Sequence, residues 1–355
     1  MSRITLRDVA REARVSPSTV SLYVRGQPGV SLAMQQRIAA AIEKLGYQPR
    51  LRSRANHHRL VGLVVERLPL PLFSDIFYAE VIQGIEQQAK ALGMSVIFSI
   101  VEGQNLKQVL SSHQAEGWLI LGGGSITDTQ ILEVQQAGIP FVLLDNYVRG
   151  ADLDCVLPDN ISGGYQAFRH LLDLGHRRIA IICGPEKYKT LGDRLAGALI
   201  AAGEAGLTRE ELILQPSLSS GYPKKGYREM KALLERSPRP TAVFAVSDKT
   251  AFGALEAMKE AGVRVPDEIS IVGFDDVTES SHTLPPLTTV HIPKRELGIV
   301  AMQKLADILS GRKLPPTQML VYTHLIRRGS TAPPSLANAS EVSSSILLTK
   351  RPSGG

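Results

Sequence analysis

The chain has 355 residues, of which 43% are hydrophobic and 21% are charged, a profile typical of a soluble protein with two or three domains. No stretch approaches the roughly 18 apolar residues of a membrane-spanning helix, and the first ten residues lack the apolar core of a signal peptide. We therefore expect a cytoplasmic protein without a membrane partner.

The positive charge is concentrated near the N-terminus. Residues 1–60 contain 11 Lys and Arg against three Asp and Glu, a net charge of +8, whereas the rest of the chain contains 29 against 31, a net charge of −2. A basic module on a nearly neutral body is typical of nucleic-acid binding, although a solvated basic surface gives the same sum. The two cysteines, Cys155 and Cys183, are isolated, which predicts neither a disulfide framework nor a zinc finger.

Residues 1–46 are predicted to form three short helices. Thr5 is the expected N-cap of the first, Ser16 caps the second with Pro17 at its first position, and the third follows Ser31 and ends at Gly46. Two short helices joined by a tight turn are typical of a helix-turn-helix, whose second helix enters the major groove and which usually binds a palindrome as a dimer. The alternative is a small bundle for protein contacts, in which the serines serve only as caps.

A basic linker at 49–60 precedes a long region of alternating apolar runs and amphipathic stretches. This pattern predicts parallel βα units in two lobes, with a break near 158–164. Strands are expected at 61–65, 95–99, 118–121, 141–144, 178–182, 242–246 and 269–272, with helices that include 77–92 and 250–261. Residues 335–355 have no periodicity and no heptad repeat, so we expect a disordered tail and a dimer rather than a tetramer.

Ligands of open α/β sheets bind beyond the carboxyl ends of the strands. Asp145, Asp248 and Asp275 follow predicted strands directly. Together with a donor such as Arg194, they suit a polyhydroxylated ligand on an apolar floor. The expected floor is aromatic: Phe73, Phe77, Tyr78 and Tyr147. Each Asp alone is equally explained as the N-cap of the next helix.

An enzyme is the rival class for such a body. The glycines at 122–124 lack the third glycine of a dinucleotide fingerprint, and residues 221–226 are not followed by the Lys and Ser or Thr of a P-loop. There is no Gly-x-Ser-x-Gly motif, and the histidines lack zinc-site spacing. We therefore predict no catalytic residue, no metal and no cofactor.

Several segments together resemble the lactose-repressor (LacI/GalR) family, from about residue 5 to 334. They are TLRDVAREARVS at 5–16, STVS at 18–21, IEKLGYQP at 42–49, GHRRI at 175–179, RLAG at 194–197, VPDEISIVGFDD at 265–276, PPLTT at 285–289 and STAPP at 330–334. The resemblance implies an α/β protein with an N-terminal all-α helix-turn-helix domain and a two-lobed effector domain like periplasmic binding proteins, built on parallel sheets.

The resemblance also implies domain limits: 1–48 for DNA binding, 49–60 for the hinge, 61–334 for effector binding and dimerisation, and 335–355 for the tail. Lobe 1 is expected at about 61–158 and 291–322, and lobe 2 at about 159–290 and 323–334. The implied function is a ligand-responsive regulator, most simply a repressor, that binds a palindromic operator as a homodimer. Its implied effector is a sugar or sugar derivative between the lobes. The alternatives are a nucleoside or purine co-repressor and, more remotely, a solute-binding protein or an enzyme on the same fold.

The residues expected to contact DNA combine the family's pattern with the chemistry of each side chain. They are Thr5, Pro17, Ser18, Thr19, Ser21, Leu22, Arg25, Leu51, Arg52 and Arg54. Leu22 stands where relatives commonly have Arg, the side chain best suited to guanine, so this chain is expected to prefer a different operator. Arg52 stands at the family's minor-groove leucine, and the linker is shorter than usual. Either Leu51 wedges in a shifted register, or Arg52 enters the groove, or the linker is only a basic tether.

The residues expected to contact the effector follow in the same way: Phe77, Tyr78, Asp145, Arg194, Ser247, Asp248 and Asp275. Arg194 of RLAG and Asp275 of GFDD match effector contacts of the family, and Asp145 matches a position in its first lobe. Ser247 stands where an Asn is common, which weakens the transfer of sugar specificity from relatives.

Overall fold

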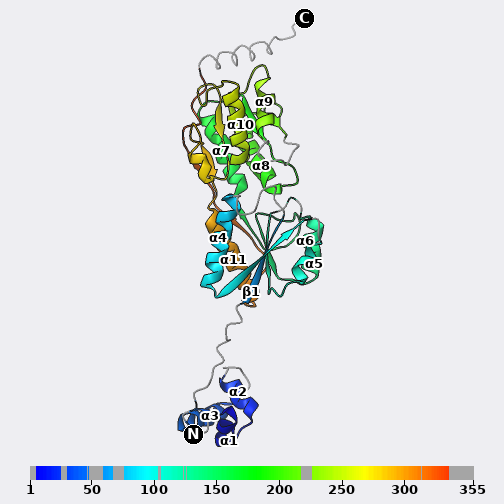
Figure 1. The fold of residues 1–355 in the computed structure, drawn as a ribbon, viewed down its shortest axis with the longest axis vertical. Coiled ribbons are helices and arrows are strands. Elements are labelled where there is room, and N and C mark those ends of the chain that lie inside the picture. Colours follow the sequence, from blue (N-terminus) through cyan, green and yellow to red (C-terminus); the bar gives the residue numbers. More distant parts are fainter. Residues whose placement is uncertain are drawn as a thin grey trace. The chain divides into compact units, whose positions relative to one another are not determined.

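The computed structural model describes residues 5–24, 30–45, 47, 59–66, 76–102, 105–122, 124, 126–216, 226–312 and 314–335. The chain separates into two compact units, Met1–His58 and Arg59–Gly355, drawn in Figure 1. Arg25, Leu51, Arg52 and Arg54 lie outside the described residues, as do Phe73 and the predicted tail from residue 336 onward.

The N-terminal unit contains the three predicted helices: α1 (Leu6–Ala13), α2 (Pro17–Val24) and α3 (Leu32–Leu45). Their apolar faces meet in one small core because the apolar side chains recur at helical spacing. The fully or nearly buried members of this core are Val9, Ala10, Ala13, Val20, Val30, Ile38 and Ala41.

The C-terminal unit contains two parallel sheets, each the centre of one lobe. The lobe 1 sheet has the order β11-β5-β4-β3-β1-β2, and the lobe 2 sheet has the order β7-β6-β8-β9. The lobe 1 strands are β1 (Arg59–Glu66), β2 (Met94–Val101), β3 (Trp118–Leu121), β4 (Phe141–Leu144), β5 (Cys155–Pro158) and β11 (Gln318–Val321). Those of lobe 2 are β6 (Ile179–Ile182), β7 (Ile213–Gln215), β8 (Ala242–Ala245) and β9 (Ser270–Val272).

Helices cover both faces of each sheet, which explains why the strands are apolar along their whole length. In lobe 1, α4 (Ile76–Ala91) and α11 (Lys294–Leu309) pack on one face, and α5 (Leu106–Ser111) and α6 (Asp128–Gln136) on the other. In lobe 2, the pairs are α7 (Asn160–Asp173) with α8 (Lys189–Glu204), and α9 (Tyr227–Leu234) with α10 (Asp248–Glu260). Figure 1 shows these layers.

A two-stranded antiparallel ribbon connects the lobes. Its strands are β10 (Thr289–His291), which leads from lobe 2 into α11, and β12 (His324–Ile326), which returns from β11 to lobe 2. The chain passes between the lobes a third time where β5 of lobe 1 leads into α7 of lobe 2. The sequence predicted strands at the positions of β1, β2, β3, β4, β6, β8 and β9 and did not predict β5, β7, β10, β11 and β12. Length does not separate the two groups, because β3, β4, β6, β8 and β9 also have only three or four residues. Within the described residues no helix is long and apolar enough to span a bilayer.

Candidate functional site

The turn between α1 and α2 is fixed by backbone hydrogen bonds. Arg14 ends α1 in the left-handed region, with φ 52°, and the amide of Val15 donates to the carbonyl of Ala10 at 3.0 Å, an arrangement in which glycine is more usual. The hydroxyl of Ser16 then accepts from the amide of Thr19 at 3.1 Å, with Pro17 at the first position of α2. The predicted cap is confirmed, and the start of α2 is rigidly defined.

The described DNA-contact residues lie at the start and along one side of α2, or at the start of α1. Pro17 and Ser18 are exposed, whereas Thr19, Ser21 and Leu22 are half-buried, with Leu22 packed against the core of the unit. The exposed Thr5 donates from its backbone amide and from its hydroxyl to the Asp8 carboxylate, at 2.8 and 2.6 Å. These hydrogen bonds lower the pKa of Asp8.

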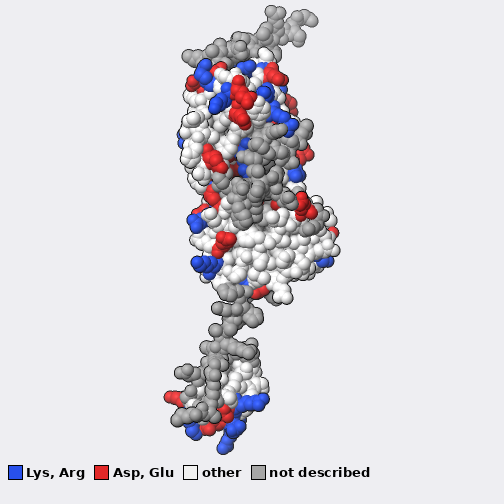
Figure 2. All heavy atoms as spheres, in the orientation of Figure 1, with Lys and Arg blue, Asp and Glu red and all other residues white. Residues whose placement is uncertain are grey.

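Cationic side chains surround these helices. Arg11 pairs with Asp8 at 3.8 Å and Lys44 with Glu12 at 2.7 Å. In the described part of this unit, Arg7, Arg14 and Arg37 have no carboxylate within ion-pairing distance, and Lys and Arg are visible at its surface in Figure 2. Unpaired guanidinium groups are available for phosphate contacts.

In the C-terminal unit, Arg194 is the centre of a buried polar cluster. It lies on α8 with 3% of its surface exposed. Its Nε donates to Asn160 Oδ1 at 2.9 Å, and its Nη1 donates to the carbonyl of Val246 and to Asp275 Oδ1, both at 2.8 Å. The guanidinium carbon lies 3.9 Å from the ring centroid of Phe274. The group is therefore locked in place by three acceptors and one aromatic face.

Close packing of α7 on α8 holds Arg194 at this position. A Cβ on Gly164 would lie 2.0 Å from the carbonyl oxygen of Arg194, and a Cβ on Gly197 would lie 2.0 Å from that of Ile161. Only glycine at both positions permits this backbone approach. The helix crossing, rather than a loop, sets where the guanidinium lies.

Asp275 connects this cluster to the ribbon between the lobes. It follows β9, adopts φ 119° and is 8% exposed. Its backbone amide donates to the carbonyl of Val290 in β10 at 2.9 Å. The carboxylate that binds Arg194 is thus attached directly to a strand that crosses between the lobes.

Asp145 supplies the lobe 1 side of the cluster. It follows β4 with φ 54°, and its buried Oδ1 has no hydrogen-bond partner among the described residues. Desolvation raises the pKa of Asp145 to about 7; Arg194 opposes this rise, whereas Asp275, Asp193 and Glu66 add to it. A buried acceptor without a donor costs free energy, so this carboxyl group is suited to a ligand that supplies the donor.

Direct contacts between the lobes border this cluster. The Tyr147 hydroxyl donates to Asp193 Oδ1 at 2.9 Å, and Lys189 Nζ donates to Asp128 Oδ1 at 2.6 Å and to the carbonyl of Tyr147. Burial raises the pKa values of both Tyr147 and Asp193. The hydrogen bond between them adds to the rise for Tyr147 and opposes it for Asp193. The two lobes therefore meet through named polar groups beside Asp145 and Arg194.

Comparison with known proteins agrees with this architecture. The model of bacterial regulatory proteins of the lacI family matches residues 5–50, and that of periplasmic binding protein-like domains matches residues 168–331. The HTH-type transcriptional repressor PurR of Erwinia tasmaniensis is 35% identical over 339 residues, which cover 92% of this chain and 97% of that relative. The chain belongs to the LacI family.

Solved structures of LacI-family regulators have the same fold. A complex of the transcriptional regulator CelR with cellobiose aligns at a TM-score of 0.70 with 32% identity, over 92% of this chain and 100% of that one. A lac repressor dimer bound to operator and the anti-inducer ONPF aligns at 0.69 with 26% identity, over 93% and 100%. The predicted family and fold class are confirmed, and the chain is a DNA-binding transcriptional regulator rather than an enzyme.

Asp248 requires a correction to the expected effector contacts of this LacI-family member. Its side chain is fully buried, and its carboxylate accepts from the amide of Val277 at 3.0 Å, from the Ser280 hydroxyl at 2.6 Å and from the Thr289 hydroxyl at 2.5 Å. Burial raises the pKa of Asp248 while these donors oppose the rise. The carboxylate holds the segment after β9 against β10 and has no free face for a ligand.

Phe77 and Ser247, two other residues expected to contact the effector, make contacts that stabilise the fold. Phe77 is 7% exposed and belongs to the lobe 1 core, where its ring meets that of Tyr78 edge-on at 5.4 Å. Of the expected aromatic floor, the half-buried Tyr78 and Tyr147 remain, and Phe73 lies outside the described residues. Ser247 is the N-cap of α10, and its hydroxyl accepts from the amide of Thr250 at 3.3 Å.

Sequence reasoning missed three residues of the cluster: Glu66, Asp193 and Asn160. Glu66 ends β1 and is 2% exposed. It directly follows an apolar run, which is the same signal that identified Asp145. Asp193 precedes Arg194 by one residue, and nothing in the local pattern marks it as a partner of Tyr147. Asn160 begins α7, and its role depends on the helix crossing described above.

Proposed function

We propose that this LacI-family chain is an effector-responsive repressor that acts in the cytoplasm, where its DNA target lies. It binds a palindromic operator as a homodimer. The proposal is supported by the family match, by the similarity to the transcriptional repressor PurR, and by the similarity to the lac repressor, a dimer bound to its operator in the solved structure. Two copies of the N-terminal unit then present two α2 helices to successive half-sites.

The proposed effector is a small polyhydroxylated molecule, a sugar or sugar derivative, between the lobes. One observation carries this part: the buried Oδ1 of Asp145 in lobe 1 has no hydrogen-bond partner among the described residues, and Tyr147, two residues further on, binds Asp193 beside the Arg194–Asp275 pair of lobe 2. Carboxylates accept from hydroxyl groups and the guanidinium donates to ring or hydroxyl oxygens, so directional contacts come from both lobes. The CelR structure, similar along nearly its whole length, contains cellobiose.

Effector binding acts on DNA affinity through lobe closure. A ligand that contacts both Asp145 and Arg194 favours one arrangement of the lobes, and this preference is the free energy available for coupling, typically about 1 to 3 kcal/mol. The alternative effector is a nucleoside or purine that acts as a co-repressor. It differs from the sugar in requiring an aromatic face in addition to hydroxyl partners.

Selection of duplexes from a random pool, followed by a ligand screen on the same full-length protein, tests both parts. We expect a two-fold symmetric site, and we expect a saccharide such as cellobiose to raise the melting temperature and change operator affinity. Adenine, guanine and adenosine are screened as well, and they test the alternative that the effector is a purine or nucleoside. Selection of no sequence would contradict the regulator, whereas an operator without any response to saccharides would contradict only the sugar.

Replacement Leu22→Arg is expected to change operator preference. Leu22 lies on α2 and contacts only apolar surface, whereas an arginine there gains bidentate contact with guanine, about 1 to 3 kcal/mol per contact. We therefore expect roughly 5- to 150-fold tighter binding for each half-site that carries a G·C pair at the position facing residue 22. Competition binding against single-pair operator variants measures the shift, with Leu22→Met as the control. An unchanged ranking of duplexes for Leu22→Arg would show that residue 22 does not read bases.

A further inference from the structure

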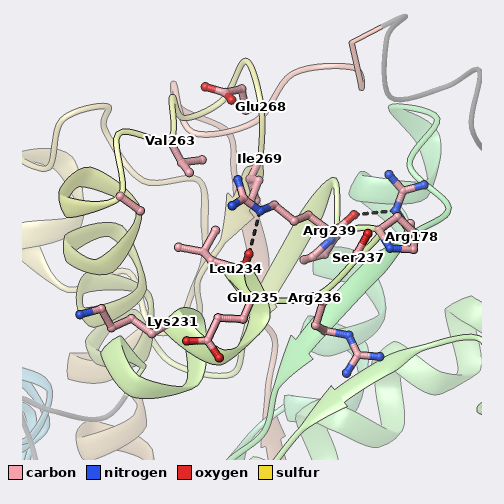
Figure 3. A pocket seen from close by; sticks show the side chains of 13 residues that line it. Arg178, Lys231, Leu234, Glu235, Arg236, Ser237, Arg239, Val263, Glu268 and Ile269 are labelled. Atoms are coloured by element: carbon pink, nitrogen blue, oxygen red, sulfur yellow. Dashed lines mark hydrogen bonds between the residues drawn. The ribbon is translucent and has the colours of Figure 1, made fainter.

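A second pocket lies at the opposite edge of the lobe 2 sheet from the Arg194 cluster. It encloses about 690 Å³, a volume in the range of small-molecule sites. Its walls come from the end of α9, the segment that leads into β8, the segment between α10 and β9, and the residue before β6 (Figure 3). These are the amino ends of the strands, whereas Val246 and Asp275 follow the carboxyl ends. The pocket is therefore separate from the site between the lobes.

The inner wall of this pocket is apolar. Leu234, Val263 and Ile269 line it, and each contributes a side chain that is anchored in the lobe 2 core. Figure 3 shows Arg239 extended across the pocket between Leu234 and Ile269, with Arg178 beside it. An apolar wall under guanidinium groups is suited to a ligand with both an apolar body and an anionic group.

Two of the guanidinium groups are held in place by the backbone. Nε of Arg178 donates to the carbonyl of Arg239 at 2.6 Å, and Nε of Arg239 donates to the carbonyl of Leu234 at 2.7 Å. Each bond fixes the plane of its guanidinium and leaves the two terminal amino groups as donors. Because the side chains are already ordered, less entropy is lost when they bind an oxyanion in bidentate fashion.

Three of the four described cations that line the pocket have no carboxylate partner, whereas Lys231 is paired with Glu260 at 4.0 Å. The carboxylates of Glu235 and Glu268 also line the pocket. No carboxylate of the described residues lies within ion-pairing distance of Arg178, Arg236 or Arg239. By contrast, the Glu268 carboxylate on the same rim is paired with Arg264 at 3.3 Å. The positive charge at this pocket is therefore available to a ligand rather than consumed in the fold.

We propose that this pocket binds a small organic anion. Its carboxylate or phosphate oxygens are held by Arg178 and Arg239, and its apolar body packs on Leu234, Val263 and Ile269. The site is a second ligand site of the regulator, independent of the one between the lobes. The segments that form it lead directly into β8 and β9, the strands that Val246 and Asp275 follow at their other ends.

Isothermal titration of the full-length protein with four probes tests this proposal. Phenyl phosphate and benzoate carry the two candidate oxyanions, benzamide is the neutral counterpart, and inorganic phosphate lacks an apolar body. We expect one site per chain for phenyl phosphate or benzoate, and the tighter of the two identifies the oxyanion. Benzamide and inorganic phosphate are expected to bind at least about tenfold more weakly, the loss of one charged contact or of the apolar contact.

Two variants within the pocket and two controls outside it locate the site. Arg178→Met is expected to weaken binding about tenfold or more. Arg236→Met, whose side chain has no hydrogen bond to the described protein, removes a rim charge without a cost to folding and is expected to weaken binding a few-fold. Arg169→Met, an exposed arginine elsewhere in lobe 2, is the matched control and is expected to bind normally, as is Asp145→Asn.

Any of three further results would overturn the proposal by itself: no binding of either anion below about 10 mM, equal affinity for benzamide, or equal losses for Arg169→Met and Arg178→Met. A fourth concerns the place of the site. Loss of binding in Asp145→Asn would place the anion between the lobes instead, and would likewise refute this site while leaving the proposed repressor function intact.

Discussion

Arg194→Ala is expected to lower the free energy of unfolding of the C-terminal unit by about 3 to 5 kcal/mol. The substitution removes three hydrogen bonds and the contact with Phe274, and it leaves the Asp275 carboxylate buried without its cation. Urea unfolding followed by circular dichroism measures the loss. The same variant is expected to lose effector binding, so a folded preparation must be verified before its response is interpreted.

A second substitution separates the unpaired charge from the lost packing. In the Arg194→Ala background, Asp275→Asn removes the buried carboxylate that has lost its cation. The double variant is therefore expected to regain part of the lost stability. A loss below about 1 kcal/mol for Arg194→Ala, or no recovery in the double variant, would mean that water reaches this cluster and that the pair contributes little.

Asp145→Asn is expected to reduce the loss of stability between about pH 4 and pH 7; burial also raises the pKa of Asp248 to about 7, so Asp248 contributes the rest. In the folded protein the pKa of Asp145 is about 7, above its usual value of about 4. Between these two pH values the folded state therefore holds a proton that the unfolded state has released. Stability from this group is present at low pH and falls as pH rises toward 7, with a limiting slope of about 1.4 kcal/mol per pH unit.

Asparagine stays neutral and tolerates the positive φ of this position. Asp145→Asn is thus expected to be more stable than the parent at pH 8 by up to about 4 kcal/mol, the slope multiplied by the roughly three units between the two pKa values, and to lose effector affinity. Thermal melts from pH 5 to 8 provide the measurement, and Asp152→Asn, an exposed aspartate of the same lobe, is the control. A parent protein whose melting temperature rises steadily from pH 5 to 8, with the same slope in Asp145→Asn, would refute the assignment.

The apolar strands, and the aspartates Asp145 and Asp275 beside Arg194, were predictable from the sequence for a common physical reason. Buried parallel strands are continuous apolar runs, and polar residues directly after such runs lie at the ligand-binding edge of the sheet. This reasoning places Asp145 and Asp275 correctly beside Arg194, and applied consistently it would also have found Glu66.

The same reasoning fails where a role depends on long-range contacts. Asp248 follows a strand just as Asp145 does, but its three donors come from residues 277–289, and no local pattern reveals that they surround it. Phe77 is apolar at a helix start, and the sequence does not tell whether that face meets a ligand or the sheet. The short β10 and β12 exist because they pair with each other across two chain crossings, and their own sequences do not mark them.

The glycine contact between α7 and α8 has an implication for how ligand preference changes in this protein. Since two backbones touch at Gly164 and Gly197, the cation of lobe 2 is anchored to the most rigid part of its scaffold. Lobe 1 instead contributes through residues at strand ends, where a side chain is exchanged without moving a helix. A change of ligand preference is thus expected to arise through substitutions at the strand ends of lobe 1, while Arg194 of lobe 2 stays in place.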